Sequence, residues 1–257
     1  MYNLKESEWL TVNKILLELY DISDIDGFAD RVLRVFRMLI PYYKGYFIIF
    51  DSNGQIRREY SSNVEMDEAS YDNYINSYFE KDYLKYMFEI SKHTVTYRDT
   101  DIMEEEHRKK TDFYREYLRP NHIPYGAGVV FFNERKIIGI MNYFRDENLG
   151  DFSDKDMFVL DVLKDHLSHM LVRLIKKEEH IVIDKKRSLK KISMEMGLSG
   201  REEEVLEDIL EGMSNAEIAE ELSISLSTVK KHIYHIFTKF GVSTRTQLRV
   251  VIEKRKI

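Results

Sequence analysis

Apolar residues near the carboxy terminus recur at the three- and four-residue spacing of amphipathic helices. The pattern predicts four short helices, at about 199–212, 214–222, 225–240 and from 243 onwards. Ser199 with Glu202, and Ser214 with Glu217, have the spacing of a capping box, in which hydroxyl and carboxylate satisfy backbone N–H groups of the first turn. We therefore expect a small all-α four-helix domain at this end of the chain.

The third of these helices has two different faces when its residues are placed at 100° steps. One arc is apolar and must face the core; it holds Val229, Ile233, Ile236, Phe237 and Phe240. The opposite arc carries Ser227, Lys231, Tyr234, His235 and Thr238, and Lys230 and His232 flank it. A short turn joins this helix to the one before it. The pair reads as a helix-turn-helix unit whose second helix presents hydrogen-bonding groups to the major groove of DNA.

The distribution of charge supports this interpretation. The chain is acidic, with 39 Lys+Arg against 45 Asp+Glu, yet residues 222–252 contain no acid. Residues 176–257 carry a net charge of +2 and residues 1–175 a net charge of −8. Opposite signs in the two parts indicate different partners. The three acids Glu202, Glu203 and Glu204 of the first helix are expected on the side turned away from DNA.

The run LSGREEEVLEDILEGMSNAEIAEELSISLSTVKKHIYHIFTKFGVSTR, residues 198–245, resembles the LuxR-type (NarL/FixJ-type) helix-turn-helix domain. The matching positions are Leu198, Arg201, Glu202, Glu204, Val205, Leu206, Gly212, Ser214, Asn215, Glu217, Ile218, Ala219, Leu222, Ile224, Ser225, Thr228, Val229, Lys230, His232, Ile236, Lys239, Val242 and Arg245. The chain departs from the family pattern at Tyr234, which is often polar or basic there, and at Phe240, which is usually Leu. The resemblance implies a DNA-binding transcriptional regulator.

The resemblance also implies roles for individual residues. Contacts of the recognition helix fall at Lys230, Lys231 and Tyr234. Contacts to the DNA backbone fall at Ser214, Asn215, Thr228, Lys239 and Arg245. The free N–H groups at the start of the second helix, near Ser214 and Asn215, are a further candidate phosphate site. The fourth helix is commonly the dimer contact in this family, which points to Leu248, Val251 and Ile252.

The amino-terminal part predicts a mixed α+β domain. Helices are expected at about 7–19, 25–39, 70–78 and 82–90; strands at 46–50, 56–60, 127–132 and 136–143; and a long helix over 153–175. Helices around a sheet built from hairpins resemble a GAF or PAS sensor fold. The segment FYREYLRPNHIPYGAGVVFF…IIGIMNYFRDENLGDFSDKD resembles the sensor half of many LuxR-type regulators. We therefore expect residues 1–175 to be a sensor or dimerisation domain, 176–195 a charged linker, and 196–257 the DNA-binding domain.

Two other sensor types fit the sequence poorly. A phosphoryl-accepting receiver needs an Asp at the end of a central strand, but Ser-Asn-Gly follows Asp51 and makes it a hairpin residue. Acyl-homoserine-lactone sensors carry several tryptophans around the pocket, and this chain has only Trp9. Neither a receiver nor that ligand is expected.

Tyrosines are concentrated in one stretch of the amino-terminal part. The stretch holds Tyr71, Tyr74, Tyr78, Phe79, Tyr83, Tyr86 and Phe88. These rings either cover a ligand pocket as an aromatic lid or simply pack helices on the sheet. The first interpretation implies a small-molecule ligand, whose identity the sequence does not define. The alternative is a dimerisation or protein-docking module without a ligand.

A coiled-coil-like spacing marks the long helix. Its seam consists of Leu160, Leu163, Leu167, Met170 and Leu174. The seam either joins two copies or packs on the domain's own sheet. A homodimer is expected because operator half-sites mirror a protein two-fold axis.

Candidate catalytic and cofactor chemistry is absent from the sequence. His166 and His169 lack a third metal ligand, and no phosphate-binding loop, nucleophile elbow or HExxH motif occurs. We expect no enzyme activity, no cofactor and no metal. The absence of cysteine, of a secretory signal and of any stretch of about 18 apolar residues predicts a cytoplasmic protein without a membrane span.

Overall fold

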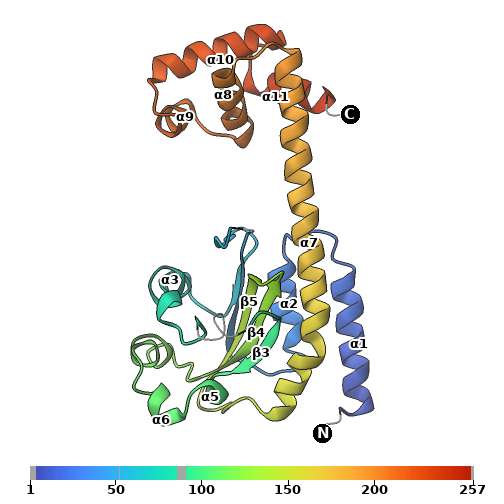
Figure 1. The fold of residues 1–257 in the computed structure, drawn as a ribbon, viewed down its shortest axis with the longest axis vertical. Helices are drawn as coiled ribbons and strands as arrows, with labels where there is room; N and C mark the ends of the chain where they lie inside the picture. Colours follow the sequence, from blue (N-terminus) through green and yellow to red (C-terminus); the bar gives the residue numbers. More distant parts are fainter. Residues whose placement is uncertain (1–3, 52, 86–90, 256–257) are drawn as a thin grey trace. The chain divides into compact units, whose positions relative to one another are not determined.

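The computed structural model describes residues 4–51, 53–85 and 91–255. The chain divides into two compact units, Met1–Glu178 and Glu179–Ile257. The first unit holds a sheet with helices on both faces, and the second holds helices alone (Figure 1). Helix α7 (Asp154–Glu195) contributes residues to both units.

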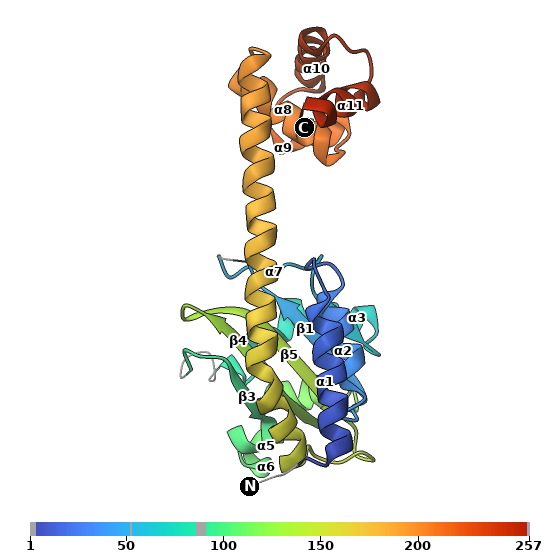
Figure 2. The same cartoon turned by 90° about the vertical axis from the view of Figure 1, so that its right-hand side faces the viewer.

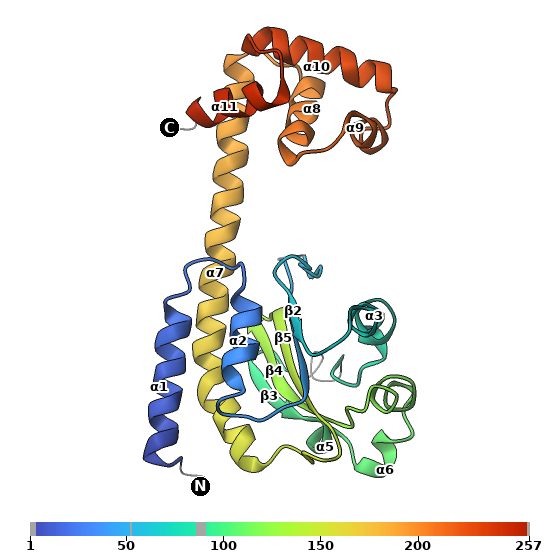
Figure 3. The ribbon, with the colours of Figure 1, turned by 180° about the vertical axis from the view of Figure 1, so that it is seen from behind.

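The sheet of the first unit has five antiparallel strands in the order β2-β1-β5-β4-β3. The strands are β1 (Lys44–Ile49), β2 (Ser62–Val64), β3 (Val95–Arg98), β4 (Tyr125–Asn133) and β5 (Lys136–Arg145). Helices α1 (Glu6–Tyr20), α2 (Phe28–Phe36) and the start of α7 cover one face (Figures 2 and 3). The helices on the other face are α3 (Glu68–Asn73), α5 (Asp99–Ile102) and α6 (Glu105–Arg108) (Figure 1). The predicted α+β fold is confirmed, and an antiparallel sheet excludes a receiver.

The hairpin after β1 differs from the prediction. Asp51 starts a tight turn, because its Oδ1 atom accepts the N–H groups of Asn53 and Gln55, both at 2.8 Å. The strand expected over 56–60 is reduced to one bridge between Phe50 and Ile56. A helical turn follows, and the hydroxyl of Ser61 accepts the Ile49 N–H at 3.0 Å in place of a strand partner. Pairing then resumes in β2.

The aromatic stretch forms irregular helical turns rather than the predicted regular helices. Helix α3 passes into a π-helical turn, η1 (Tyr74–Tyr78), and a 3₁₀ turn, η2 (Phe79–Lys81). A second π-helical turn, η3 (Tyr114–Leu118), lies on the same face of the sheet. Most of the helix expected over 82–90 lies outside the described residues. Tyr74 and Tyr83 are core residues, so the packing interpretation holds for them.

The long helix packs on its own sheet along the predicted seam. All five seam residues, Leu160, Leu163, Leu167, Met170 and Leu174, are at most 2% exposed and belong to the core of the first unit. The seam is therefore used within one chain. The helix does not end near residue 175 as expected but continues to Glu195. Leu189 and Ile192, near its end, belong to the core of the second unit.

The second unit has the predicted four helices after α7. They are α8 (Gly200–Glu211), α9 (Asn215–Glu221), α10 (Leu226–Phe240) and α11 (Arg245–Arg255). Both predicted capping boxes form, at Ser199 with Glu202 and at Ser214 with Glu217. One apolar core joins these helices, with Leu206, Val229 and Ile236 fully buried. No helix of the described ranges is long and apolar enough to cross a membrane.

Gly128 on β4 occupies a position where no side chain fits. A Cβ atom there would lie 1.9 Å from the carbonyl oxygen of Met141 on the neighbouring strand. Substitution by alanine must therefore separate β4 from β5, and we expect Gly128→Ala to lower the free energy of unfolding by more than about 3 kcal/mol. Thermal denaturation measures the change. Gly200→Ala is the control, because a Cβ there meets nothing within 4 Å. Equal melting temperatures for the two variants would contradict the strand geometry.

Candidate nucleic-acid interface

Helix α10 presents the predicted face of exposed polar side chains. Ser225 caps its start by accepting the Thr228 N–H at 3.1 Å, and Gly241 ends it with a positive φ. Val229, Ile236 and Phe240 anchor the opposite side in the core. The exposed residues of α10 include Ser227, Lys230, Lys231, Tyr234 and Thr238. They recur every three or four positions and so share one face, on which the Tyr234 ring is 68% exposed.

Glu202 on α8 holds α10 in place. Its Oε2 atom accepts from the Lys239 ammonium at 2.7 Å and from the Ser199 N–H at 2.8 Å. His235 Nδ1 lies 3.5 Å from the other carboxylate oxygen. Burial alone would raise the pKa of Glu202, but the hydrogen bonds from Lys239 and Ser199 outweigh it and lower the pKa to about 2.

The position of Glu202 differs from the expectation that it lies on the side turned away from DNA. Glu202 is only 5% exposed and lies against Lys239 and His235 of α10. Lys239 is exposed, and without DNA its ammonium binds Glu202 and the Gly197 carbonyl, both at 2.7 Å, so its predicted contact to the DNA backbone stays a prediction. His235 lies against the same carboxylate. Sequence spacing could not show these pairings, since 37 residues separate Lys239 from Glu202.

The start of α9 is also used within the domain. The Ser214 N–H donates to the Glu217 carboxylate at 2.6 Å, and the Ser214 hydroxyl accepts the Glu217 N–H at 3.3 Å. Arg245 donates to Asn215 Oδ1 at 2.5 Å and to the Met213 carbonyl. The Ser214 N–H and the Arg245 guanidinium, both expected to bind phosphate, therefore already have hydrogen-bond partners within the domain. Arg245 joins the starts of α9 and α11.

The remaining predicted residues occupy different environments. Thr228 is half-buried, and its hydroxyl shares a hydrogen bond of 2.7 Å with Ser225. His232 is half-buried, and its Nδ1 atom has no hydrogen-bond partner among the described residues. Lys230, Lys231 and Tyr234 are therefore the predicted residues that project most freely from α10.

The predicted dimer residues need revision. Leu248 is fully buried and Ile252 is 1% exposed, both in the core of their own domain, and Val251 packs against that core. Because these side chains are occupied within one chain, a contact through α11 would have to use its exposed residues. Val250, at 44% exposure, is such a residue.

A buried polar cluster lies on the sheet of the first unit, on the face covered by η1 and η3. Asp82 and Asp99 are each 2% exposed. Asp82 accepts from the Tyr74 hydroxyl at 2.8 Å, and Asp99 accepts from the Tyr83 hydroxyl at 2.6 Å. Burial raises the pKa of Asp82 to about 7 and that of Asp99 to about 6. This cluster was not predicted from the sequence. Its one signal is Gly126 within a strand, because a glycine there allows another group to approach the backbone closely, here the Asp99 carboxylate.

The raised pKa of Asp82 predicts a pH-dependent stability. Because the fold favours the neutral carboxyl, its contribution is full below the unfolded pKa near 3.8 and is lost as pH rises through about 7. The Asp82→Asn variant carries a neutral amide at this position, so it does not lose this stability as the pH rises. We expect the variant's free energy of unfolding, relative to wild type, to rise by roughly 2–3 kcal/mol between about pH 5 and about pH 8. Denaturant titrations at both pH values test this, with the exposed Asp112→Asn as the control; a flat difference would contradict it.

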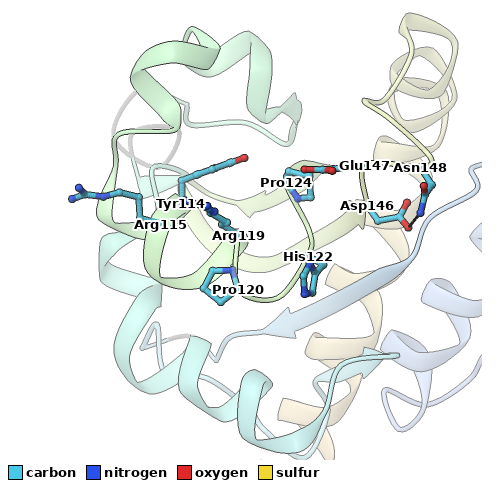
Figure 4. A pocket seen from close by; sticks show the side chains of 9 residues that line it. All are labelled: Tyr114, Arg115, Arg119, Pro120, His122, Pro124, Asp146, Glu147 and Asn148. Atoms are coloured by element: carbon cyan, nitrogen blue, oxygen red, sulfur yellow. Dashed lines mark hydrogen bonds between the residues drawn. The ribbon is translucent and has the colours of Figure 1, made fainter.

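One surface pocket of the first unit brings together no set of groups typical of catalysis or metal binding. Its volume is about 640 Å³, and it is lined by Tyr114, Arg115, Arg119, Pro120, His122, Pro124, Asp146, Glu147 and Asn148 (Figure 4). Asp146 binds its own loop, through Asn148 at 3.1 Å and the Leu149 N–H at 2.9 Å. His166, once considered as a metal ligand, contacts the Tyr20 hydroxyl at 3.0 Å. No group of three potential metal ligands occurs in the described part of the chain.

Comparison with known proteins agrees with this geometry. Residues 196–252 match the model of the luxR family of bacterial regulatory proteins. The monoamine regulon transcriptional regulator of Klebsiella aerogenes is 25% identical over 230 residues, which cover 90% of this chain and 92% of that protein. The transcriptional regulatory protein LiaR of Bacillus subtilis is 47% identical over 60 residues, 23% of this chain and 28% of LiaR.

The LBD domain of VqsR from Pseudomonas aeruginosa has a similar fold to the amino-terminal unit. The two superpose with a TM-score of 0.50 and 14% identity, over 67% of this chain and 98% of that domain. The antiparallel sheet with helices on both faces is the predicted GAF-like arrangement. The carboxy-terminal domain belongs to the luxR family. The chain is a transcriptional regulator with a LuxR-type DNA-binding domain.

Proposed function

We propose that this chain binds double-stranded DNA sequence-specifically, with α10 in the major groove. The observation that carries the proposal is the exposed face of Lys230, Lys231 and Tyr234, held opposite the buried Val229 and Ile236. Lysine and tyrosine side chains can donate to base edges, and the two ammonium groups attract phosphate. Ser227 lies on the same face, one turn earlier. The Glu202–Lys239 ion pair holds α10 against α8 in the absence of DNA.

We further propose that the regulator is a cytoplasmic homodimer under the control of a small ligand in residues 1–175. Residues 176–195 would then connect that domain to the DNA-binding domain at 196–257. The split of the chain into compact units between Glu178 and Glu179 supports the first of these boundaries, whereas residues 179–195 fall in the second unit. Ligand control is supported by the buried polar cluster, because an ordinary core has no need of two buried acids.

Docking without a ligand is the second candidate for the amino-terminal domain. Helix α1 exposes apolar side chains on its outer surface, namely Trp9, Leu10, Leu17 and Tyr20, at 42–61%. Such a surface is typical of a protein interface. A polar substitution on this surface, such as Leu17→Glu, distinguishes docking from ligand sensing. Loss of self-association or of partner binding in the variant favours docking. An unchanged assembly favours ligand sensing.

Salt dependence tests the DNA-binding proposal. Neutralised phosphates release counterions, so the logarithm of the association constant falls linearly with the logarithm of salt concentration. We expect a slope of about −4 or steeper for a dimer with at least two lysines on each α10. Fluorescence anisotropy with an operator selected from a random DNA library measures it. A slope near zero, or equal affinity for the selected and a scrambled duplex, would refute the proposal.

A further inference from the structure

A row of polar side chains crosses the centre of the sheet on its aromatic face. Strand register places Tyr46 on β1, Asn142 on β5, Gly128 on β4 and Tyr97 on β3 directly beside one another. Gly128 supplies no side chain, and a Cβ there would lie 2.8 Å from the Tyr97 hydroxyl. The glycine thus lets the Tyr97 hydroxyl lie close to the strand in the middle of an apolar core.

Hydrogen bonds lead from this row to Asp82. Asn142 Nδ2 donates to the Tyr46 hydroxyl at 3.2 Å, Tyr46 donates to the Tyr74 hydroxyl at 2.7 Å, and Tyr74 donates to Asp82 Oδ2 at 2.8 Å. The other Asp82 oxygen accepts the Leu84 N–H at 2.9 Å. Every donor in the chain points towards the carboxylate, which is the final acceptor.

No cation among the described residues forms an ion pair with Asp82. Its hydrogen bonds come from neutral donors, and among the described residues the one charge that acts on its pKa is Asp99, which raises it. The charge of Arg108 lowers the pKa of Asp99, but within the described part of the chain the Arg108 guanidinium donates to the Pro124 carbonyl and forms no ion pair with Asp99. A buried carboxylate without a counter-charge is costly unless it takes up a proton or a cation.

Two further acceptors in the row are vacant. Asn142 Oδ1 and the Tyr97 hydroxyl have no hydrogen-bond partner among the residues that the structure describes, although Asn142 is 2% and Tyr97 3% exposed. Buried polar atoms are rarely left without a partner in folded proteins. The row therefore lacks a group that donates several hydrogen bonds at once.

Aromatic rings surround the end of the chain of hydrogen bonds. The Tyr74 ring lies 4.8 Å from Tyr46, 5.4 Å from Tyr117 and 6.2 Å from Phe113, between ring centroids. The Tyr83 ring lies 5.5 Å from Phe113. Tyr74 and Tyr117 both belong to π-helical turns, which occur frequently at functional sites. Faces of such rings attract an organic cation.

We propose that this cluster binds a small organic cation, whose primary ammonium group donates to Asp82 and to the vacant acceptor of Asn142. The apolar body of the ligand lies against the rings of Tyr74, Tyr83 and Phe113. A primary ammonium carries three donors and one positive charge, which are the two things that the row lacks. Because Tyr46 and Tyr74 are stacked and buried, entry requires the η1 turn to move. The inference rests on the proposed ligand control of residues 1–175 and specifies its chemistry.

Binding of paired amines and alcohols to the full chain tests this inference. Isothermal titration with 2-phenylethylamine and n-butylamine is compared with 2-phenylethanol and n-butanol, which have the same body and no charge. We expect at least one amine to bind more than about tenfold tighter than its alcohol. Equal affinities for amine and alcohol, or no amine binding up to about 10 mM, would overturn the inference.

Variants locate the binding site. Asp82→Asn is expected to weaken amine binding at least about tenfold, whereas the exposed Asp112→Asn leaves it unchanged. If Asp82→Asn does not fold, Asn142→Leu removes the vacant acceptor and should weaken amine binding about fivefold or more. Wild-type affinity in a folded Asp82 or Asn142 variant contradicts the site. DNA binding of the same preparations is measured separately. If DNA binding is intact and amine binding is absent, only this inference is contradicted. If DNA binding is absent, the proposed function is contradicted.

Discussion

Replacing Lys230 and Lys231 together by alanine is expected to weaken specific DNA binding at least about 100-fold. Each lysine lies on the exposed face of α10, and no ion pair within the described ranges involves either of them. A good contact to a base edge contributes about 1–3 kcal/mol, so the loss of two contacts exceeds about 2 kcal/mol, and further phosphate attraction is lost as well. Fluorescence anisotropy at one fixed salt concentration measures the change.

The control for this variant keeps the change in charge constant. Lys185 and Lys186 are neighbouring exposed lysines on α7. Their double substitution by alanine removes the same two positive charges at a place without a predicted role in DNA binding. We expect its affinity to fall less than about threefold and both variants to melt like wild type. Similar losses in the two double variants would mean that net charge, and not the α10 face, governs binding.

Glu202→Ala is expected to destabilise the carboxy-terminal domain by roughly 2–3 kcal/mol. The substitution removes the capping box at the start of α8 and leaves Lys239 without its buried counter-charge. Lys239 keeps only its bond to the Gly197 carbonyl. Helix α10 then loses its link to α8, so specific DNA binding should weaken too. Denaturant unfolding followed by circular dichroism measures the stability.

The contribution of Glu202 to stability depends on pH, because the pKa of its carboxyl group is lowered in the folded protein. The folded pKa of Glu202, about 2, lies below its ordinary value of 4.5. Its contribution to stability is therefore complete above about pH 4.5 and disappears as the pH falls towards 2. The difference between wild type and Glu202→Ala should shrink over that range. Glu203→Ala, one residue along the same helix, is the control. A variant at Glu202 as stable as that control at neutral pH would contradict the anchoring role.

The sequence predicts the carboxy-terminal domain well because its signals are local. Capping boxes at Ser199 and Ser214, and glycines at Gly212 and Gly241, define helices through contacts within four residues. The apolar arc of α10 likewise predicts which side is buried. The family resemblance predicts DNA-backbone contacts at Lys239 and Arg245, and no local pattern indicates that both side chains also pair within the domain. Their partners lie 37 and 30 residues away.

The amino-terminal unit shows where local signals end. The strands β4 and β5 were predicted because they are long, apolar and joined by a tight turn. The four-residue strand β3 was missed, since its alternation is too short to stand out. The strand expected at 56–60 does not form, because the Ser61 hydroxyl accepts the Ile49 N–H in place of a backbone carbonyl of a partner strand. The buried relay from Asn142 to Asp82 joins residues 60 positions apart and has no local signature.

Methylation interference on the selected operator tests the central claim, that α10 enters the major groove, most directly. Guanine N7 lies in the major groove and adenine N3 in the minor groove, so the two methylated positions report on different faces of the duplex. The account predicts that methylated guanine N7 blocks binding in two clusters about one helical turn apart, as a dimer requires. Interference confined to adenine N3, or none at either position, would contradict it.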